Sequence, residues 1–278
     1  MSARVPVKRT AKLFIGGAFP RSESGRSYEV FADDGKPLAY AAQASRKDLR
    51  DAVLAARGAF PTWSSMTAYN RGQILYRVAE LMEGRRSQFR DELADAGAAD
   101  PDRGVDAAID RWVWYAGWAD KIAQTLGTSN PVAGPYFNFT IPEPTGVVGI
   151  VAPVDQSLLG LVSRLAPAIV GGNTAVVLAS ERSPLPAVSL AEVLATSDVP
   201  GGVVNILTGH RAELAPWLAA HMDVNAIDVT GADGLAPELE RAAADNVKRV
   251  VRGAATGQSP WEIAAFLELK TVWHPIGT

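Results

Sequence analysis

The stretch VAPVDQSLLGLVSRLAPAIVGGNTAVVL, from Val151 to Leu178, decides the fold. It begins with an apolar strand that ends near Pro153, continues through a long apolar segment, and passes a Gly-Gly turn into a second β-branched strand. A strand, a crossover helix and a parallel strand form half of a nucleotide-binding architecture. Yet Asp155 and Leu178 occupy two positions where functional side chains are expected, which raises the question of whether the chain kept a shape without its chemistry.

The same alternation continues to residue 252 and predicts the central architecture. Strands are predicted at 147–152, 174–179, 203–207, 225–230 and 247–252, and helices at 157–170, 186–195, 211–220 and 235–244. Each strand is short and apolar, and each connection is long enough for a crossover helix. The pattern predicts an α/β fold with a doubly wound, Rossmann-like parallel sheet of about five strands.

The N-terminal part is predicted to hold two short strands followed by helices. Lys12–Gly17 and Ser27–Phe31 are apolar or alternating runs typical of strands. Ser45 precedes an amphipathic pattern and predicts a helix N-cap. Further helices are predicted from 68 to 85 and from 105 to 124, and the Trp and Tyr stripe on the latter is interpreted as core rather than as a ligand-stacking surface.

Two alternating segments fall outside this pattern. Tyr136–Ile141 follows a loop at 126–135 and is predicted to form a hairpin with the strand at 147–152. Phe266–Trp273 also alternates, but it has no neighbour in sequence and must pair with a distant segment or with another chain. Between the sheet and this last strand, the composition of Gly253–Pro260 predicts a linker.

Composition excludes several classes of protein. The chain has 278 residues, 47% of them hydrophobic and 21% charged, which is typical of a globular protein. A net charge of −3 argues against a nucleic-acid or anionic-membrane partner. No apolar run reaches the roughly 18 residues of a membrane span, and the basic N-terminal run lacks an apolar signal region, so a cytoplasmic location is expected. The chain has no cysteine and three scattered histidines, which argues against disulfides, a cysteine nucleophile and a metal site.

Candidate cofactor residues lie in the turns after the strands, because ligands of open parallel sheets bind at the carboxyl ends of the strands. Gly231 and Gly234 permit a close backbone approach to a pyrophosphate, although their spacing is also typical of a tight turn. Asp233 would place a negative charge beside a phosphate. Glu181 could accept hydrogen bonds from ribose hydroxyls, or it could be an ordinary acid at a helix start.

A series of motifs follows the order and spacing of one known family. They are KLFIGGAFPRSESGRSYEV, ASRKDLRDAVLAARGAFPTWSSM, YAGWADKI, GPYFNFTIPEPTGVVGIVAP, LAPAIVGGNTAVVL, SPLPAVSLAEVL, VPGGVVNILTGH, the VTG at Val229–Gly231, and FLELKTVWHPIG. Each motif alone is weak, but together they are highly specific. The chain resembles the aldehyde dehydrogenase superfamily along most of its length.

The resemblance implies a subunit of three parts. These are a nucleotide-binding domain, a catalytic domain that carries a cysteine nucleophile, and an oligomerisation hairpin to which a C-terminal strand adds. Residues 1–134 and 147–252 correspond to the first part, and residues 135–146 and 266–278 to the third. Residues 253–265 form a linker where the family has its catalytic domain, so a truncated member without that domain is expected.

By the same resemblance, NAD(P) would be the cofactor, bound weakly or not at all. The positions that would contact it are Val151, Pro153, Glu181, Thr230 and Gly231.

Other functional positions of the family hold different residues here. Asp155 stands where the family has an asparagine that binds the oxyanion, and a carboxylate cannot donate that hydrogen bond. Leu178 replaces a lysine that contacts the adenosine ribose, and Ala232 replaces a serine near the pyrophosphate. Arg252 falls where the general-base glutamate is expected, and arginine cannot act as a base.

These losses favour a non-catalytic protein, a pseudoenzyme without catalytic residues. It is expected to act as an assembly or regulatory subunit, with itself or with a full-length aldehyde dehydrogenase, through residues 135–146 and 266–278. An NAD(P)-binding module and a residual oxidoreductase acting on aldehydes stay open as alternatives, as do a silent relic and an engineered deletion. The cleft near Asp155, Glu181 and Asp233 is expected to be open to solvent.

Overall fold

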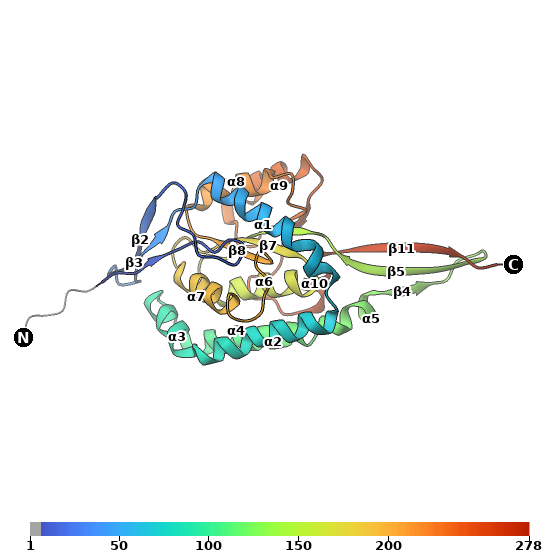
Figure 1. Ribbon diagram of the computed structural model, residues 1–278, viewed down its shortest axis with the longest axis horizontal. Helices are drawn as coiled ribbons and strands as arrows, with labels where there is room; N and C mark the ends of the chain where they lie inside the picture. The colour runs from blue at the N-terminus through green and yellow to red at the C-terminus, as the bar shows by residue number, and fades with distance from the viewer. Residues whose placement is uncertain (1–6, 278) are drawn as a thin grey trace, which may run out of the picture.

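The computed structural model describes residues 7–277, and a five-stranded parallel sheet forms its centre (Figure 1). The strand order is β10-β9-β6-β7-β8, and all neighbouring pairs are parallel. The strands are β6 (Val147–Val151), β7 (Thr174–Leu178), β8 (Val204–Leu207), β9 (Ala226–Asp228) and β10 (Arg249–Val251). The crossover helices are α6 (Leu159–Val170), α7 (Leu185–Leu194), α8 (Arg211–Ala220) and α9 (Ala236–Ala244). The predicted fold class is confirmed.

Two hydrophobic cores form on the two faces of this sheet, because successive side chains of a strand point to opposite faces. Val148 and Ile150 enter the core that α6 and α7 cover together with the N-terminal helices at 68–84 and 101–116. Val147 and Val151 enter the core under α8, α9 and the N-terminal helix at 46–65. All five residues of β6 and of β7 are buried. Burial on both faces explains why these strands are uninterrupted apolar runs.

The N-terminal helices cover both faces of the sheet. They are α1 (Arg46–Ser65), α2 (Ala68–Gly84), α3 (Arg86–Asp95) and α4 (Pro101–Ala116), followed by the 3-10 turn η1 (Ala119–Lys121) and α5 (Ile122–Leu126). Ser45 is the N-cap of α1, as predicted, and it forms a capping box with Asp48. Trp112 and Tyr115 are fully buried, which confirms that the aromatic stripe is core. The predicted single helix over 105–124 is wrong, because α4 ends at Ala116 before Gly117.

A small N-terminal sheet has the strand order β1-β3-β2, with β1 (Thr10–Ala11), β2 (Ser27–Phe31) and β3 (Pro37–Ala42). The prediction for Ser27–Phe31 is confirmed. The strand predicted at 12–17 is reduced to isolated bridges, Phe14 with Ile206 and Ile15 with Ala18. The strand β3 is not among the predicted elements.

The third sheet has the order β11-β5-β4 and lies away from the body of the molecule (Figure 1). Its strands are β4 (Thr128–Asn130), β5 (Tyr136–Pro144) and β11 (Leu267–Pro275). The predicted hairpin between residues 136–141 and 147–152 is wrong, because β5 pairs with β4 and β11 while β6 belongs to the central sheet. The predicted loop at 126–135 contains β4. The final strand does pair with a distant segment, antiparallel from Leu267 with Pro144 to Pro275 with Tyr136.

Residues 253–265, predicted to be a linker, contain the helix α10 (Pro260–Ala264) and are held to the body by a buried arginine. Arg164 of α6 is fully buried and donates from Nε to Asp228 Oδ2 at 2.6 Å. Its Nη1 pairs with Glu262 of α10. A Cβ at Gly253 would lie 2.1 Å from Arg164 Nη1, so a larger residue there would displace the guanidinium. The segment therefore docks through a charge at the centre of the molecule.

A second arginine fastens the same segment. Arg111 of α4 donates through Nη1 to the carbonyls of Thr256, at 3.1 Å, and Gly257, at 2.5 Å. The same nitrogen lies 2.5 Å from Ser163 Oγ. Because backbone carbonyls need donors when they leave solvent, this arrangement fixes the path of the chain before α10.

Replacing Arg164 with Met is expected to lower the free energy of unfolding by about 3–5 kcal/mol, because Asp228 would stay buried without its counter-charge. Urea denaturation of the full chain measures the loss. Arg182→Met is the matched control, since Arg182 also pairs with carboxylates but on the surface, where such pairs contribute about 1 kcal/mol or less. If the two variants lost equal stability, the buried pair would not be the attachment point.

Candidate functional site

The turns after β6 and β9 meet at the carboxyl edge of the sheet. Gly231 N–H donates to the carbonyl of Val151 at 3.1 Å. A Cβ at Gly231 would lie 2.4 Å from backbone atoms of Ala152 and Pro153, so only glycine allows this approach. The structure thus brings together the predicted residues Val151, Pro153 and Gly231, with Thr230 next to them.

The backbone donors of this turn are already used. Thr230 N–H donates to Asp228 Oδ1 at 2.8 Å, and Ala232 N–H donates to the carbonyl of Val229 at 2.9 Å. Thr230 Oγ1 accepts from Gly253 N–H at 2.9 Å. With Gly231 bonded to Val151, all three N–H groups from 230 to 232 have internal partners. The turn therefore does not fit a pyrophosphate, which is bound by free N–H groups at such positions.

Glu181 follows β7 and has two internal partners. Its Oε1 lies 2.5 Å from His210 Nδ1, and its Oε2 accepts from Arg211 N–H at 3.1 Å. Partial burial alone would raise the pKa of Glu181, but the hydrogen bonds from His210 and Arg211 outweigh it and hold the pKa below its ordinary value. The carboxylate is therefore ionised at neutral pH. Its side chain is 39% exposed, so a ribose could reach it only in competition with His210.

Arg211 contacts all three turns and is not among the residues predicted from the sequence. Its Nη2 donates to the carbonyl of Ala152 at 3.2 Å, and its Nη1 lies 3.6 Å from Asp233 Oδ2. Its own N–H binds Glu181. Desolvation of this buried side chain lowers the pKa of Arg211. The only signal in the sequence is an arginine at the first position of a predicted helix, which on its own indicates nothing about distant turns.

Arg182 spans the mouth of this region. Its Nη2 lies 2.6 Å from Asp33 Oδ1, and its Nη1 lies 3.6 Å from Asp155 Oδ1. The side chains of Asp155 and Asp233 are 82% and 74% exposed, which confirms the expectation that this edge is open to solvent. A cavity of about 560 Å³ lies beside it, lined in part by Glu181, Arg182 and Arg211.

Leu178 and Arg252, which replace family residues, lie apart from these contacts. Leu178 is 1% exposed in the core, and Arg252 binds Glu240 on the surface. Within residues 7–277 there is no cluster of His, Asp and Glu side chains that could hold a metal ion. The same residues include no helix with the length and hydropathy required to cross a membrane.

Comparison with known proteins decides the family. The sequence profile of the aldehyde dehydrogenase family matches residues 19–274. The chain belongs to the aldehyde dehydrogenase family. It is 35% identical over 249 residues to aldehyde dehydrogenase, cytosolic 1, of Elephantulus edwardii, covering 86% of this chain and 49% of that protein. It is 34% identical over 267 residues to human retinal dehydrogenase 2, covering 93% of this chain and 51% of that protein.

Solved structures of the family agree with the fold. The NAD⁺ complex of aldehyde dehydrogenase from Bacillus cereus superimposes with a TM-score of 0.79 at 28% sequence identity, over 87% of this chain and 50% of that one. This aldehyde dehydrogenase family chain spans about half the length of the curated relatives it matches.

Replacing His210 with Ala is expected to raise the pKa of the Glu181 carboxyl toward its ordinary value, because the carboxylate loses a hydrogen bond and a nearby positive charge. An NMR titration of the glutamate side-chain carboxyls measures the change. A depressed pKa contributes stability that is present at neutral pH and is lost as the pH falls through the folded-state pKa, so the variant should also lose less stability on acidification. His221→Ala, at the other end of α8, is the control, and an equal shift in it would contradict the assignment.

Proposed function

We propose that this chain is a non-catalytic member of the aldehyde dehydrogenase family that serves as an assembly or regulatory subunit. It pairs through the sheet β4-β5-β11 with itself or with a full-length aldehyde dehydrogenase. The chain has no cysteine, so it cannot supply the thiolate that the family uses. The observation that carries the proposal is a sheet whose two faces both hold exposed apolar side chains.

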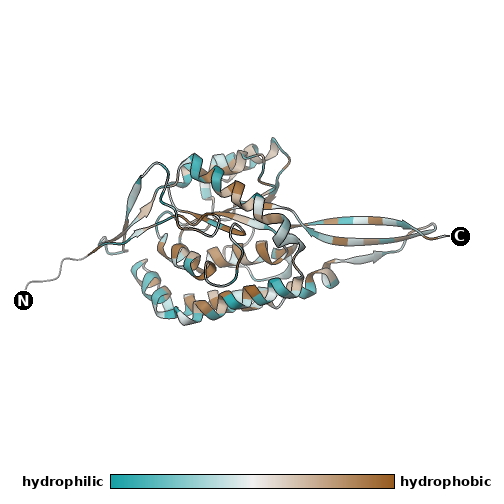
Figure 2. Ribbon diagram, in the orientation of Figure 1, coloured by the Kyte–Doolittle hydropathy of each residue, from teal (hydrophilic) through white to brown (hydrophobic). Residues whose placement is uncertain are grey.

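The pairing of β5 with β11 defines these two faces. On the first face, Tyr136 and Trp273 are 44% and 58% exposed. Their rings pack edge to face, with the ring centroids 5.8 Å apart. On the second face, Phe137 and Ile141 are 49% and 40% exposed. The ring centroids of Phe137 and Phe139 lie 5.4 Å apart. Figure 2 shows hydrophobic residues alternating along β5 and β11 outside the body. A small sheet without a buried face is barely stable alone, so this one is built to be covered.

The edge of the sheet supports the same proposal. β11 is an outer strand of nine residues, and its side away from β5 has no strand partner among residues 7–277. Proteins usually shorten or protect such an edge, because its free N–H and C=O groups pair readily with another chain. A second subunit can add a strand there and cover an apolar face at the same time.

The solution mass of the purified chain tests the proposal, together with co-purification from its native cells. An oligomer is expected, either alone or with a full-length aldehyde dehydrogenase in fixed proportion. Trp273→Glu and Phe137→Glu are each expected to reduce the complex to a monomer of unchanged circular dichroism, because each places a charge on one of the two apolar faces. Tyr69→Glu, at an exposed aromatic residue on α2, is the matched control. A wild-type chain that stays monomeric and elutes alone would end the proposal.

A second candidate, an NAD(P)-binding module, is favoured by Glu181, an ionised and partly exposed carboxylate at a position that the family resemblance assigns to the cofactor. We infer that such binding is weak, because the N–H groups of the 230–232 turn have internal partners and Asp233 stands next to them. Calorimetric titration with NAD⁺ and NADP⁺ is expected to give dissociation constants of about 1 mM or weaker. Asp233→Ser, which removes the charge, should tighten binding, whereas micromolar binding by the wild-type chain would favour the nucleotide-binding module.

A further inference from the structure

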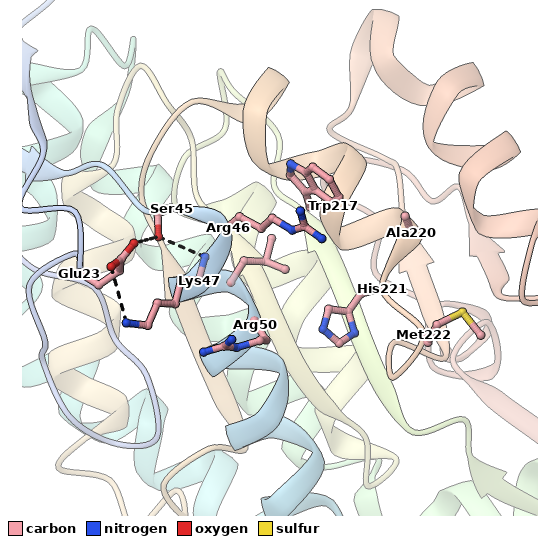
Figure 3. Close-up of a pocket in the computed structure, with 10 residues that line it drawn as sticks. Glu23, Ser45, Arg46, Lys47, Arg50, Trp217, Ala220, His221 and Met222 are labelled. Carbon is pink, nitrogen blue, oxygen red and sulfur yellow. Dashed lines mark hydrogen bonds and ion pairs between the residues drawn. The ribbon is translucent and has the colours of Figure 1, made fainter.

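A hollow of about 700 Å³ lies between α1 and α8, outside the turns at the carboxyl edge of the sheet (Figure 3). Its walls come from the first turns of α1 and from the C-terminal end of α8 with the residues that follow it. It shares no residue with the cavity beside Glu181. The hollow is therefore a separate feature of the molecule, which neither the family resemblance nor the proposed assembly uses.

Positive charge predominates in this hollow. Arg46, Lys47 and Arg50 line it from α1, and Glu23 is the one carboxylate among its lining residues. Lys47 lies 3.6 Å from Glu23, and Arg50 pairs with Asp51 at 3.0 Å. The charges of Lys47 and Arg50 are thus partly compensated by carboxylates, and the excess positive charge of the hollow comes mainly from Arg46.

Arg46 is placed by an aromatic ring rather than by a carboxylate. Its guanidinium carbon lies 3.5 Å from the centre of the Trp217 ring, and Figure 3 shows the two groups against each other. A stacked guanidinium keeps its N–H donors in the plane of the group, directed past the edge of the ring. Such a fork can bind both oxygens of a carboxylate or two oxygens of a phosphate.

Backbone donors contribute little here, so the side chains must provide recognition. Ser45 Oγ accepts from the N–H groups of Lys47 and Asp48 at 3.2 and 3.3 Å, and it donates to Glu23 at 3.0 Å. The capping box therefore already uses two of the N–H groups in the first turn of α1.

The other wall provides an apolar surface and a neutral donor. Trp217 and Met222 are 43% and 72% exposed, and the buried Leu49 also lines the hollow. His221 Nδ1 accepts from Asp223 N–H at 3.2 Å, which leaves Nε2 as the protonated nitrogen of the neutral ring. Burial lowers the pKa of His221, so the ring is neutral at pH 7. The His221 ring faces the space between the two helices (Figure 3).

We propose that the hollow between α1 and α8 binds a small organic anion in which a planar ring carries a phosphate or a carboxylate. The anionic group accepts from the guanidinium of Arg46, with Arg50 adding charge. The ring packs against Trp217 and Met222. Both parts are required, because the cations are too exposed to hold a simple ion tightly and the apolar wall is too small to hold a neutral ring.

Calorimetric titration of the full chain with phenyl phosphate and with benzoate tests this proposal. Inorganic phosphate and phenol serve as the separated halves of phenyl phosphate, and formate and benzene as those of benzoate. At least one of the two aromatic anions is expected to bind about tenfold more tightly than either half, and the one that binds better identifies the anionic group. If neither aromatic anion bound better than inorganic phosphate, the proposal would be overturned.

Variants locate the binding. Arg46→Ala and Trp217→Ala are each expected to weaken binding about tenfold, because each removes one member of the stacked pair. Both side chains are exposed, and circular dichroism checks that the variants fold. Arg182→Ala, which removes an exposed arginine at the carboxyl edge of the sheet, should bind like the wild type. Binding that survives both hollow variants, or that Arg182→Ala abolishes, would place the ligand elsewhere and refute the assignment.

Discussion

The buried pair of Arg164 and Asp228 links the central sheet to the segment that leads into the third sheet. Asp228 ends β9 in the central sheet, and Arg164 lies on α6, where it also holds Glu262 of α10. Removing two charges from water is costly, and the cost is offset only when geometry and further hydrogen bonds are right. Gly253 provides the space and Arg111 holds the preceding carbonyls. From α10 the chain passes directly into β11, so the position of the third sheet depends on a contact deep inside the body.

The sequence was sufficient to predict the central sheet because its strands are buried on both faces. β6 and β7 are apolar runs whose ends lie within one residue of the predicted limits. The region around β5 was harder to predict. An alternating strand, a turn and an apolar strand are the usual pattern of a hairpin, but here the chain leaves one sheet and enters another. Only the tertiary partner of β5, more than a hundred residues away in β11, distinguishes the two arrangements.

The carboxyl edge shows what a motif can and cannot predict. The family resemblance predicts Gly231 and Glu181 as cofactor contacts, and the sequence is sufficient to make that prediction. The sequence cannot show that Gly231 closes on Val151 and Ala152, or that Glu181 binds His210 and Arg211. Those contacts depend on three turns meeting at one edge. A chain can therefore keep a residue type at a position while the hydrogen-bonding groups of that residue bind other parts of the protein. The residue type can be seen in the sequence, but these contacts can be seen only in the structure.

The doubly exposed sheet has a consequence for how much of this chain a cell can hold. Under the proposed assembly, copies of the chain in excess of their partner would leave two apolar faces and the nine-residue edge strand β11 in water. Proteases and aggregation would act on these uncovered copies, whereas association protects the copies that bind a partner. The proposed assembly would therefore couple the abundance of this chain to that of its partner, through turnover as well as through synthesis.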